Sequence, residues 1–394
     1  WGYPSSGRLS FSASNYSEMK YFIIAGEPSG DLHGSNLVRN LFSADPAADI
    51  SCWGGDMMKD AGAVLLKHYN ETAFMGAWEV LVNIRKVRAN FADCRRQLAE
   101  MRPDVVILID YPGFNLRIAR YAKGLGLKVF YYIAPKLWAW REGRVSLIRA
   151  FVDRLYIIFP FETAFFRRHG CEAHYLGNPL IDQIEAYRTG APDPKSLMAS
   201  LGLEDKPVIA LLSGSRQQEI KHILPAMVSV ARSLPDYQFV IAAMGHLPEE
   251  LYRLISGSMP VKVITNRTYE ILSVAEAALV ASGTATLEAA LFDVPQVVCY
   301  RTSRVTYRLA KLVIKVRFIS LANLIMDREI VRELVQNDLN QKNLHRELLN
   351  IIGSGYRHDI IKSDYRQLRN VLGERGASSR IASDMVQNLI QRGK

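Results

Sequence analysis

Short runs of apolar residues alternate with longer stretches of mixed apolar and polar positions along the first half of the chain. The short runs, bounded by glycine and proline, are typical of buried strands, and the mixed stretches are typical of helices with one packed face. We expect strands near residues 20–25, 50–53, 64–66, 104–110, 128–133, 154–159 and 172–177. The repeated order of strand, turn and helix indicates an open parallel sheet covered by helices.

The same order begins again after residues 188–195, R-T-G-A-P-D-P-K, whose two prolines and one glycine indicate a linker. Further strands are expected near residues 208–212, 238–243, 261–265, 277–281 and 296–300. The α/β pattern therefore predicts two Rossmann-like parallel-sheet domains. We place them at residues 19–187 and 188–355, with polar helices in 356–394 that have no sheet of their own.

Composition narrows the class of protein. The 49 lysines and arginines outnumber the 39 aspartates and glutamates and give a net charge of +10, which favours an anionic partner such as a nucleotide or a phospholipid surface. No apolar run reaches about 18 residues, so we expect no transmembrane helix. Residues 1–18 are rich in serine, glycine and asparagine, and we expect a disordered leader before a natural start at Met19. The four scattered cysteines are expected to be buried free thiols in a reducing compartment.

The stretch from Ala281 to Arg301 contains the first candidate site. An expected strand ends at the small-residue turn Ser282-Gly283-Thr284, and a helix should begin near Ala285. The free N–H groups at such a helix start can bind a phosphate, because small turn residues leave room for it. Glu288 lies one turn into this helix and could accept hydrogen bonds from the two hydroxyls of a ribose. An ordinary turn with a solvated glutamate is the alternative.

A second group of candidates lies where the expected strands of the first half end. Asp110 ends the apolar run D-V-V-I-L-I-D, at the carboxyl edge where open α/β sheets bind their ligands. The first strand runs into G-E-P-S-G-D, residues 26–31, which is not G-x-G-x-x-G and gives no support to dinucleotide binding. Glu27, Asp31 and His33 are further candidates here. A capping role is the alternative for Asp110 and for His33.

Six motifs, in this order, closely resemble the lipid-A-disaccharide synthase family, whose members are glycosyltransferases of the two-Rossmann GT-B architecture. The serine–glycine–arginine loop and the G-T-A-T-L-E-A motif are shared by many GT-B enzymes, whereas the tryptophan-rich segment and S-L-A-N-L-I are more specific. The motifs are G-E-P-S-G-D at 26–31, I-D-Y-P-G-F-N at 109–115, P-K-L-W-A-W-R at 135–141, S-G-S-R-Q-Q-E-I at 213–220, G-T-A-T-L-E-A-A at 283–290 and S-L-A-N-L-I at 320–325.

The resemblance covers the chain from about Met19 to its end, with small departures. Proline stands at position 28 where threonine is common, and Tyr111-Pro112-Gly113 stands where Ala-Pro-Asp is common. The resemblance implies two sheet domains facing a cleft, with C-terminal helices crossing back onto the first domain or a partner subunit. It also implies transfer of 2,3-diacylglucosamine from UDP to the 6-hydroxyl of 2,3-diacylglucosamine 1-phosphate, which makes a β-1,6 disaccharide in lipid A biosynthesis.

Such a transfer needs a stabilised leaving diphosphate and a base for the acceptor hydroxyl. No two aspartates are two positions apart, so the chain lacks the Asp-x-Asp pair with which many glycosyltransferases hold a metal, and we expect no metal and no cofactor. Arg216 and the helix start at 283–286 should instead stabilise the charge of the phosphates. Asp110 is our choice of base, with Glu27 and His33 as rivals. The expected nucleotide-sugar site consists of Ser213, Gly214, Ser215, Arg216, Glu219, Ser282, Gly283, Thr284, Ala285, Thr286, Glu288 and Asn323, and the expected catalytic residues are Asp110, Arg216 and Glu27.

Two segments have the pattern of a surface that binds an anionic membrane. Apolar residues recur at helical spacing in the first, and a basic stripe lies beside an apolar stripe in the second. Core packing with solvated charges is the alternative for both. The residues are Phe74, Met75, Trp78 and Leu81 in the first segment and Arg304, Arg308, Lys311 and Lys315 in the second.

The family resemblance implies three partners: a UDP-diacylglucosamine donor, a diacylglucosamine 1-phosphate acceptor, and the cytoplasmic face of the inner membrane of a Gram-negative-type bacterium. A homodimer stays possible. Trp138 and Trp140 lie near the basic Lys136, but such basic–aromatic motifs are not repeated along the chain, so we expect no nucleic acid as a partner. A sugar-facing wall is the favoured role of these tryptophans, and a place in the core is the alternative. Two other functions remain as alternatives: a UDP-N-acetylglucosamine 2-epimerase, and a non-catalytic nucleotide-dependent lipid-binding protein.

Overall fold

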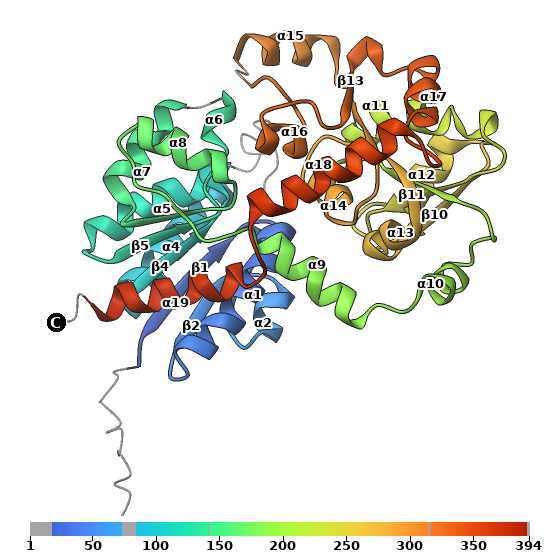
Figure 1. The fold of residues 1–394 in the computed structure, drawn as a ribbon. Coiled ribbons are helices and arrows are strands. Elements are labelled where there is room, and N and C mark those ends of the chain that lie inside the picture. The colour runs from blue at the N-terminus through green and yellow to red at the C-terminus, as the bar shows by residue number, and fades with distance from the viewer. Residues whose placement is uncertain (1–17, 73–83, 141, 314–315, 392–394) are drawn as a thin grey trace, which may run out of the picture.

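Two parallel sheets with helices packed against them form the structure (Figure 1). The computed structural model describes residues 18–72, 84–140, 142–313 and 316–391. The first sheet has seven strands in the order β3-β2-β1-β4-β5-β6-β7. Its strands are β1 (Lys20–Ala25), β2 (Asp49–Gly54), β3 (Val64–His68), β4 (Val105–Ile109), β5 (Lys128–Tyr132), β6 (Arg154–Ile157) and β7 (His174–Tyr175).

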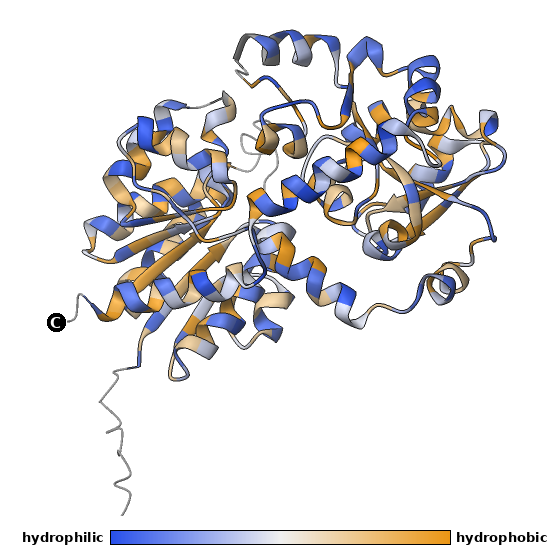
Figure 2. Cartoon of the chain, viewed as in Figure 1, coloured by the Kyte–Doolittle hydropathy of each residue, from blue (hydrophilic) through white to orange (hydrophobic). Residues whose placement is uncertain are grey.

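Alternate residues of the central strands of the first sheet pack into two cores, one on each face. Phe22, Ile24 and Val106 lie in one core, and Tyr21 and Ile23 lie in the other. The strands are more apolar than the surrounding helices, as expected of a sheet covered on both faces (Figure 2). The helices are α1 (Pro28–Ala44), α2 (Asp56–Asp60), α4 (Ile84–Met101), α5 (Pro112–Gly124), α6 (Leu137–Trp140), α7 (Val145–Phe151) and α8 (Pro160–Arg168).

The second sheet has six strands in the order β10-β9-β8-β11-β12-β13. They are β8 (Val208–Leu212), β9 (Gln238–Ala243), β10 (Val261–Thr265), β11 (Ala275–Ala281), β12 (Gln296–Tyr300) and β13 (Arg332–Val335). The helices of this half are α9 (Pro179–Gly190), α10 (Pro194–Ser200), α11 (Gln217–Val228), α12 (Glu249–Ser256), α13 (Thr268–Val274), α14 (Ala285–Leu291), α15 (Arg304–Val313), α16 (Leu321–Met326) and α17 (Gln341–Leu349). The prediction of two Rossmann-like parallel-sheet domains is confirmed.

The C-terminal helices cross from the second sheet to the first, as predicted, but only the last of them packs on the first sheet. Helix α18 (Tyr356–Leu372) contributes Tyr365 and Leu368 to the core of the second sheet, whereas α19 (Ala377–Ile390) contributes Ile381 and Met385 to the core of the first (Figure 1). The crossing therefore falls between α18 and α19. Domain boundaries at residues 187 and 355 stay a prediction.

Polar contacts fix both ends of the crossing. The carboxylate of Asp182, on α9, accepts hydrogen bonds from the backbone N–H groups of Gly376 at 2.5 Å and Ser378 at 2.8 Å, which caps the start of α19. Further along α19, the Asp384 carboxylate accepts two bonds from the Arg154 guanidinium and one from the Tyr156 hydroxyl, all at 2.7 Å. These bonds hold α19 against the first sheet.

The four cysteines are free and buried, as predicted. Among the described residues, no helix is both long and apolar enough to cross a membrane.

Candidate functional site

The first half of the site lies at the carboxyl edge of the first sheet. Strands β1, β4 and β5 are neighbours, and Ala25, Ile109 and Tyr132 lie opposite one another at their ends. Glu27 follows β1 and Asp110 follows β4, so the sheet brings these two predicted residues to one edge.

The backbone at Asp110 is held in an unusual conformation. Asp110 and Tyr111 have φ angles of 43° and 47°, in the left-handed region that side chains other than glycine seldom adopt. The buried amide of Asn115 donates to the carbonyls of Ile109 and Asp110 at 3.2 and 2.8 Å, and the Tyr131 hydroxyl donates to the Asp110 carbonyl. Strained residues supported in this way are concentrated at functional sites, so the geometry favours a functional Asp110.

The environment of Asp110 suits a general base. Burial raises the pKa of its carboxyl to about 6, the Lys136 ammonium opposes this rise, and the negative charge of Glu27 adds to it. A carboxylate with this pKa is ionised at neutral pH and still basic enough to take a proton from a hydroxyl as that hydroxyl attacks.

Two rivals for the role of base are occupied elsewhere. The buried Asp31 carboxylate accepts hydrogen bonds from the N–H groups of Gly55, Met57 and Met58 at 2.8, 3.2 and 3.1 Å, so it caps α2. Burial lowers the pKa of His33 to about 4, and its ring lies 3.1 Å from the amide of Gln183 on α9. Asp110 therefore stays our candidate for the base, and Glu27, at the same edge of the sheet, stays an alternative.

Tyr111 forms a contact that the sequence did not reveal. A Cβ atom added to Gly26 would lie 2.4 Å from the Tyr111 ring, so the ring closes directly over the first glycine of the G-E-P-S-G-D loop. The Tyr111 hydroxyl donates to the carbonyl of Thr72 at 2.8 Å, which ties β3 and its following turn to this edge. The unusual Tyr-Pro-Gly sequence thus shapes the wall beside Glu27.

The tryptophan-rich motif is anchored by a buried carboxyl. Glu162, near the start of α8, accepts a hydrogen bond from the Trp138 indole at 2.9 Å and from the Phe159 N–H at 3.1 Å. Burial raises the pKa of Glu162 to about 7. Trp138 is half-buried, packs against the core of the first domain and meets the Phe161 ring edge to face, so its role in facing a sugar stays a prediction. The side chain of Trp140 lies outside the described residues.

The loop after β8 forms the second half of the expected site. Ser213 is buried, and Gly214 has a φ of 105° with its hydrogen facing Glu219, where a Cβ atom would lie 2.7 Å from the carboxylate. Arg216 precedes α11, and its side chain is 61% exposed while it pairs with Glu219 at 3.4 Å. His246 lies 2.9 Å from the carbonyl of Ser215. An exposed pair of this kind is weak, so Arg216 can turn to a phosphate at little cost.

The turn after β11 is tied to the segment that leads into α16. The Ser282 hydroxyl donates to the carbonyl of Ile319 at 2.7 Å. Thr286 donates to the carbonyl of Gly283 at 2.8 Å and accepts from the N–H of Leu321 at 3.2 Å. A Cβ atom at Gly283 would meet nothing within 4 Å, and Thr284 is exposed while Ala285 is half-buried, so the turn is open as predicted for a ligand site.

Glu288 is half-buried behind this turn. The Tyr269 hydroxyl donates to its carboxylate at 3.4 Å, and burial raises the pKa of Glu288 to about 7. A carboxyl so placed can accept hydrogen bonds from vicinal hydroxyls, but whether it binds a ribose stays a prediction.

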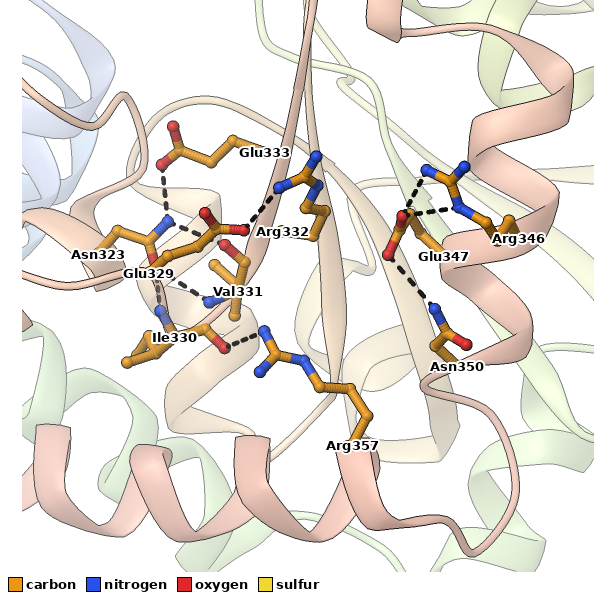
Figure 3. Close-up of polar contacts among 10 residues, drawn as sticks. All are labelled: Asn323, Glu329, Ile330, Val331, Arg332, Glu333, Arg346, Glu347, Asn350 and Arg357. Carbon is orange, nitrogen blue, oxygen red and sulfur yellow. Dashed lines mark hydrogen bonds and ion pairs between the residues drawn. The ribbon is translucent and has the colours of Figure 1, made fainter.

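The structure gives Asn323 a different place from the one expected. Its amide nitrogen donates to Val331 and Glu333, both at 2.9 Å, and its oxygen accepts from the N–H groups of Ile330 at 2.8 Å and Val331 at 3.0 Å (Figure 3). Asn323 is fully buried, and these bonds use all four positions of its amide. In this geometry Asn323 shapes the loop and offers no group to a ligand.

Glu333 completes this arrangement and was missed by sequence reasoning. Its carboxylate accepts from the N–H groups of Ile319 and Ser320 at 3.0 and 2.9 Å, so it holds the segment that receives the Ser282 hydroxyl. The signal that could have revealed it was an acidic residue within a short strand, β13.

The proposed membrane segments are only partly described. Phe74, Met75, Trp78, Leu81 and Lys315 lie outside the described residues. In α15, the side chains of Arg304, Arg308 and Lys311 are exposed, and Val305 is 69% exposed, so this helix presents basic and apolar groups together. Among the described residues, no group of three or more histidine, cysteine, aspartate or glutamate side chains could hold a metal ion.

Two Rossmann-like domains, with candidate groups at strand ends and C-terminal helices that cross back, define the GT-B class of nucleotide-sugar enzymes. Solved structures share the fold at low identity. A UDP-N-acetylglucosamine 2-epimerase from Neisseria meningitidis has a TM-score of 0.64 at 14% identity, over 94% of this chain and 100% of its own. The calicheamicin glycosyltransferase CalG4 has a TM-score of 0.60 at 16% identity, over 95% and 99%.

The family model for lipid-A-disaccharide synthetase matches residues 21–387. The lipid-A-disaccharide synthases of Syntrophus aciditrophicus and Myxococcus xanthus are each 37% identical to the chain, over 94% of its length and 97% of theirs. The chain therefore belongs to the lipid-A-disaccharide synthase family of glycosyltransferases, as the motifs predicted.

Proposed function

We propose that this protein transfers 2,3-diacylglucosamine from UDP to the 6-hydroxyl of 2,3-diacylglucosamine 1-phosphate, with inversion, to give the β-1,6-linked disaccharide 1-phosphate and UDP. The observation that carries the proposal is the Asp110 carboxyl, held by a supported left-handed backbone beside Glu27, with a pKa raised by burial to about 6. In the proposed reaction this carboxylate accepts the proton of the attacking hydroxyl.

The second domain would bind the donor. Arg216 would exchange its exposed contact with Glu219 for the diphosphate, where a guanidinium can bind two oxygens at once. The N–H groups of Gly283 and Thr284 at the start of α14 would bind the phosphates, and Glu288 lies one turn further on for the ribose. Fixed protein groups would then stabilise the negative charge that develops on the departing UDP. No cofactor has a part in this proposal.

The first domain would bind the acceptor, with its acyl chains at a membrane surface. Support for a membrane surface comes from α15 of the second domain, whose exposed Arg304, Arg308 and Lys311 suit anionic headgroups, and from the net charge of +10. The proposed location is the cytoplasmic face of the inner membrane. A homodimer, in which α19 could also contact a partner, is a further proposal.

An epimerase is the second candidate, because solved epimerases share this fold. The two functions differ in their need for an acceptor. We would incubate the protein with UDP-2,3-diacylglucosamine, with and without the monosaccharide phosphate, and separately with UDP-N-acetylglucosamine alone. A transferase releases UDP at a substantial rate only when the acceptor is present. Conversion of UDP-N-acetylglucosamine without any acceptor would favour the epimerase.

A further inference from the structure

Lys136 lies in the loop between β5 and α6, at the same edge of the first sheet as Asp110. Strands β4 and β5 are parallel neighbours, and Ile109 lies opposite Tyr132 at their ends. Neighbouring strands are about 4.8 Å apart, so the two loops leave the sheet side by side.

The loop around Lys136 is fixed while the lysine side chain stays exposed. Leu137 is 3% exposed, and Trp138 is bonded to the buried Glu162. The N–H of Ala139 donates to the carbonyl of Lys136 at 3.2 Å, which closes a turn. The residues directly after Lys136 are therefore held in place, so the flexible lysine side chain extends from a fixed backbone.

The charge of Lys136 acts on this edge of the sheet. Its ammonium is close enough to the carboxyls of Asp110 and Glu162 to lower the pKa of each against the effect of burial. Within the part of the chain that the structure describes, Lys136 forms no ion pair at 4.0 Å or less. The interactions of Lys136 with these carboxyls are therefore longer than an ion pair, and its ammonium can also bind an anionic group of the substrate.

We propose that Lys136 binds the phosphate of the acceptor and thereby selects a phosphorylated sugar. This inference rests on the proposed function. In glucosamine 1-phosphate, C1 and C5 flank the ring oxygen, and they carry the phosphate and the 6-hydroxymethyl group, so both substituents lie at the ring-oxygen edge of the sugar. A base and a cation on adjacent loops match this arrangement: the hydroxyl meets Asp110 while the phosphate meets Lys136.

The test compares two acceptors, 2,3-diacylglucosamine 1-phosphate and the same sugar without its phosphate. For Lys136→Ala, kcat/KM with the phosphorylated acceptor should fall about 10- to 100-fold, as expected for a lost charge-assisted hydrogen bond. The kcat/KM with the unphosphorylated acceptor should fall much less, because only the effect of Lys136 on the pKa of Asp110 is shared by the two acceptors, and the KM for the donor should not change. Lys136→Arg should recover part of the preference for phosphate, because it keeps the charge.

Lys128, at the amino end of the same strand, provides the matched control. Lys128→Ala should keep the full preference for the phosphorylated acceptor. An equal loss with both acceptors in Lys136→Ala would overturn the inference, since the lysine would then act through Asp110 or the loop. If the unaltered protein makes no disaccharide from either acceptor, the proposed function fails instead, and this result is distinct from the first.

Discussion

Replacing Asp110 with asparagine should abolish most activity and at the same time stabilise the protein. Burial and the nearby Glu27 raise the pKa of Asp110 from its ordinary value of 3.8 to about 6, against the opposing effect of Lys136. This difference corresponds to about 3 kcal/mol of free energy of unfolding lost at neutral pH. Because the folded pKa is the higher one, the cost is absent below about pH 3.8 and complete above about pH 6.

Asparagine keeps the shape of the side chain and tolerates the left-handed backbone at position 110, where φ is 43°. It carries no charge to desolvate, so Asp110→Asn should raise the free energy of unfolding at pH 8 by up to about 3 kcal/mol. At pH 5 the gain should be about half as large, because the folded carboxyl is then mostly protonated. The same variant cannot accept a proton, so turnover should fall about 10²- to 10⁴-fold.

The assay is urea unfolding of both proteins at pH 8 and pH 5, together with disaccharide formation and UDP binding. Asp60→Asn, at an exposed position on α2 in the same domain, is the control and should change neither property. Lower stability of Asp110→Asn at pH 8, or an equal gain at both pH values, would show that the buried charge is not the cause. Loss of UDP binding would make Asp110 a structural residue.

Three further outcomes follow from the structure. Arg216→Ala should lower kcat about 10²- to 10³-fold, and Arg216→Lys should recover only part of it; near-normal turnover in the alanine variant would remove Arg216 from the mechanism. Asp384→Ala removes the acceptor of the bonds from Arg154, and should lower the free energy of unfolding by about 2 kcal/mol; unchanged urea unfolding would show that this contact does not hold α19. Arg304→Glu with Arg308→Glu should weaken binding to anionic vesicles at low salt, by about 1 kcal/mol per cation removed; unchanged sedimentation with vesicles would exclude α15 from the membrane surface.

The periodicity of the chain predicted the strands well where they are long and apolar. Strand β8, for example, was predicted at 208–212 and is found at Val208–Leu212. Strand β13 was missed because R-E-L-V is short and half polar, and only its pairing with β12 makes it a strand. The pattern of apolar and polar residues within a segment does not reveal which strand pairs with which at the edge of a sheet.

The positions of candidate residues were predictable where they follow directly from a strand end, as for Asp110 and Glu27, whereas their roles stay a prediction. The site was not predictable where the role depends on contacts between distant segments. Asn323 looked like a ligand-binding amide, yet contacts with Glu333 and with the backbone near it use its hydrogen-bonding groups. The anchoring of Trp138 by Glu162 is another contact of this kind.

The most direct test of the proposed function is to identify the product formed from UDP-2,3-diacylglucosamine and 2,3-diacylglucosamine 1-phosphate. Mass spectrometry gives the mass of the product, and NMR of the purified lipid gives the linkage. We expect one new lipid whose mass is that of the two diacylglucosamine units with a single phosphate, joined β-1,6, and one UDP for each molecule formed. An epimerised UDP-sugar without a disaccharide, or an unchanged mixture, would contradict the proposed transferase.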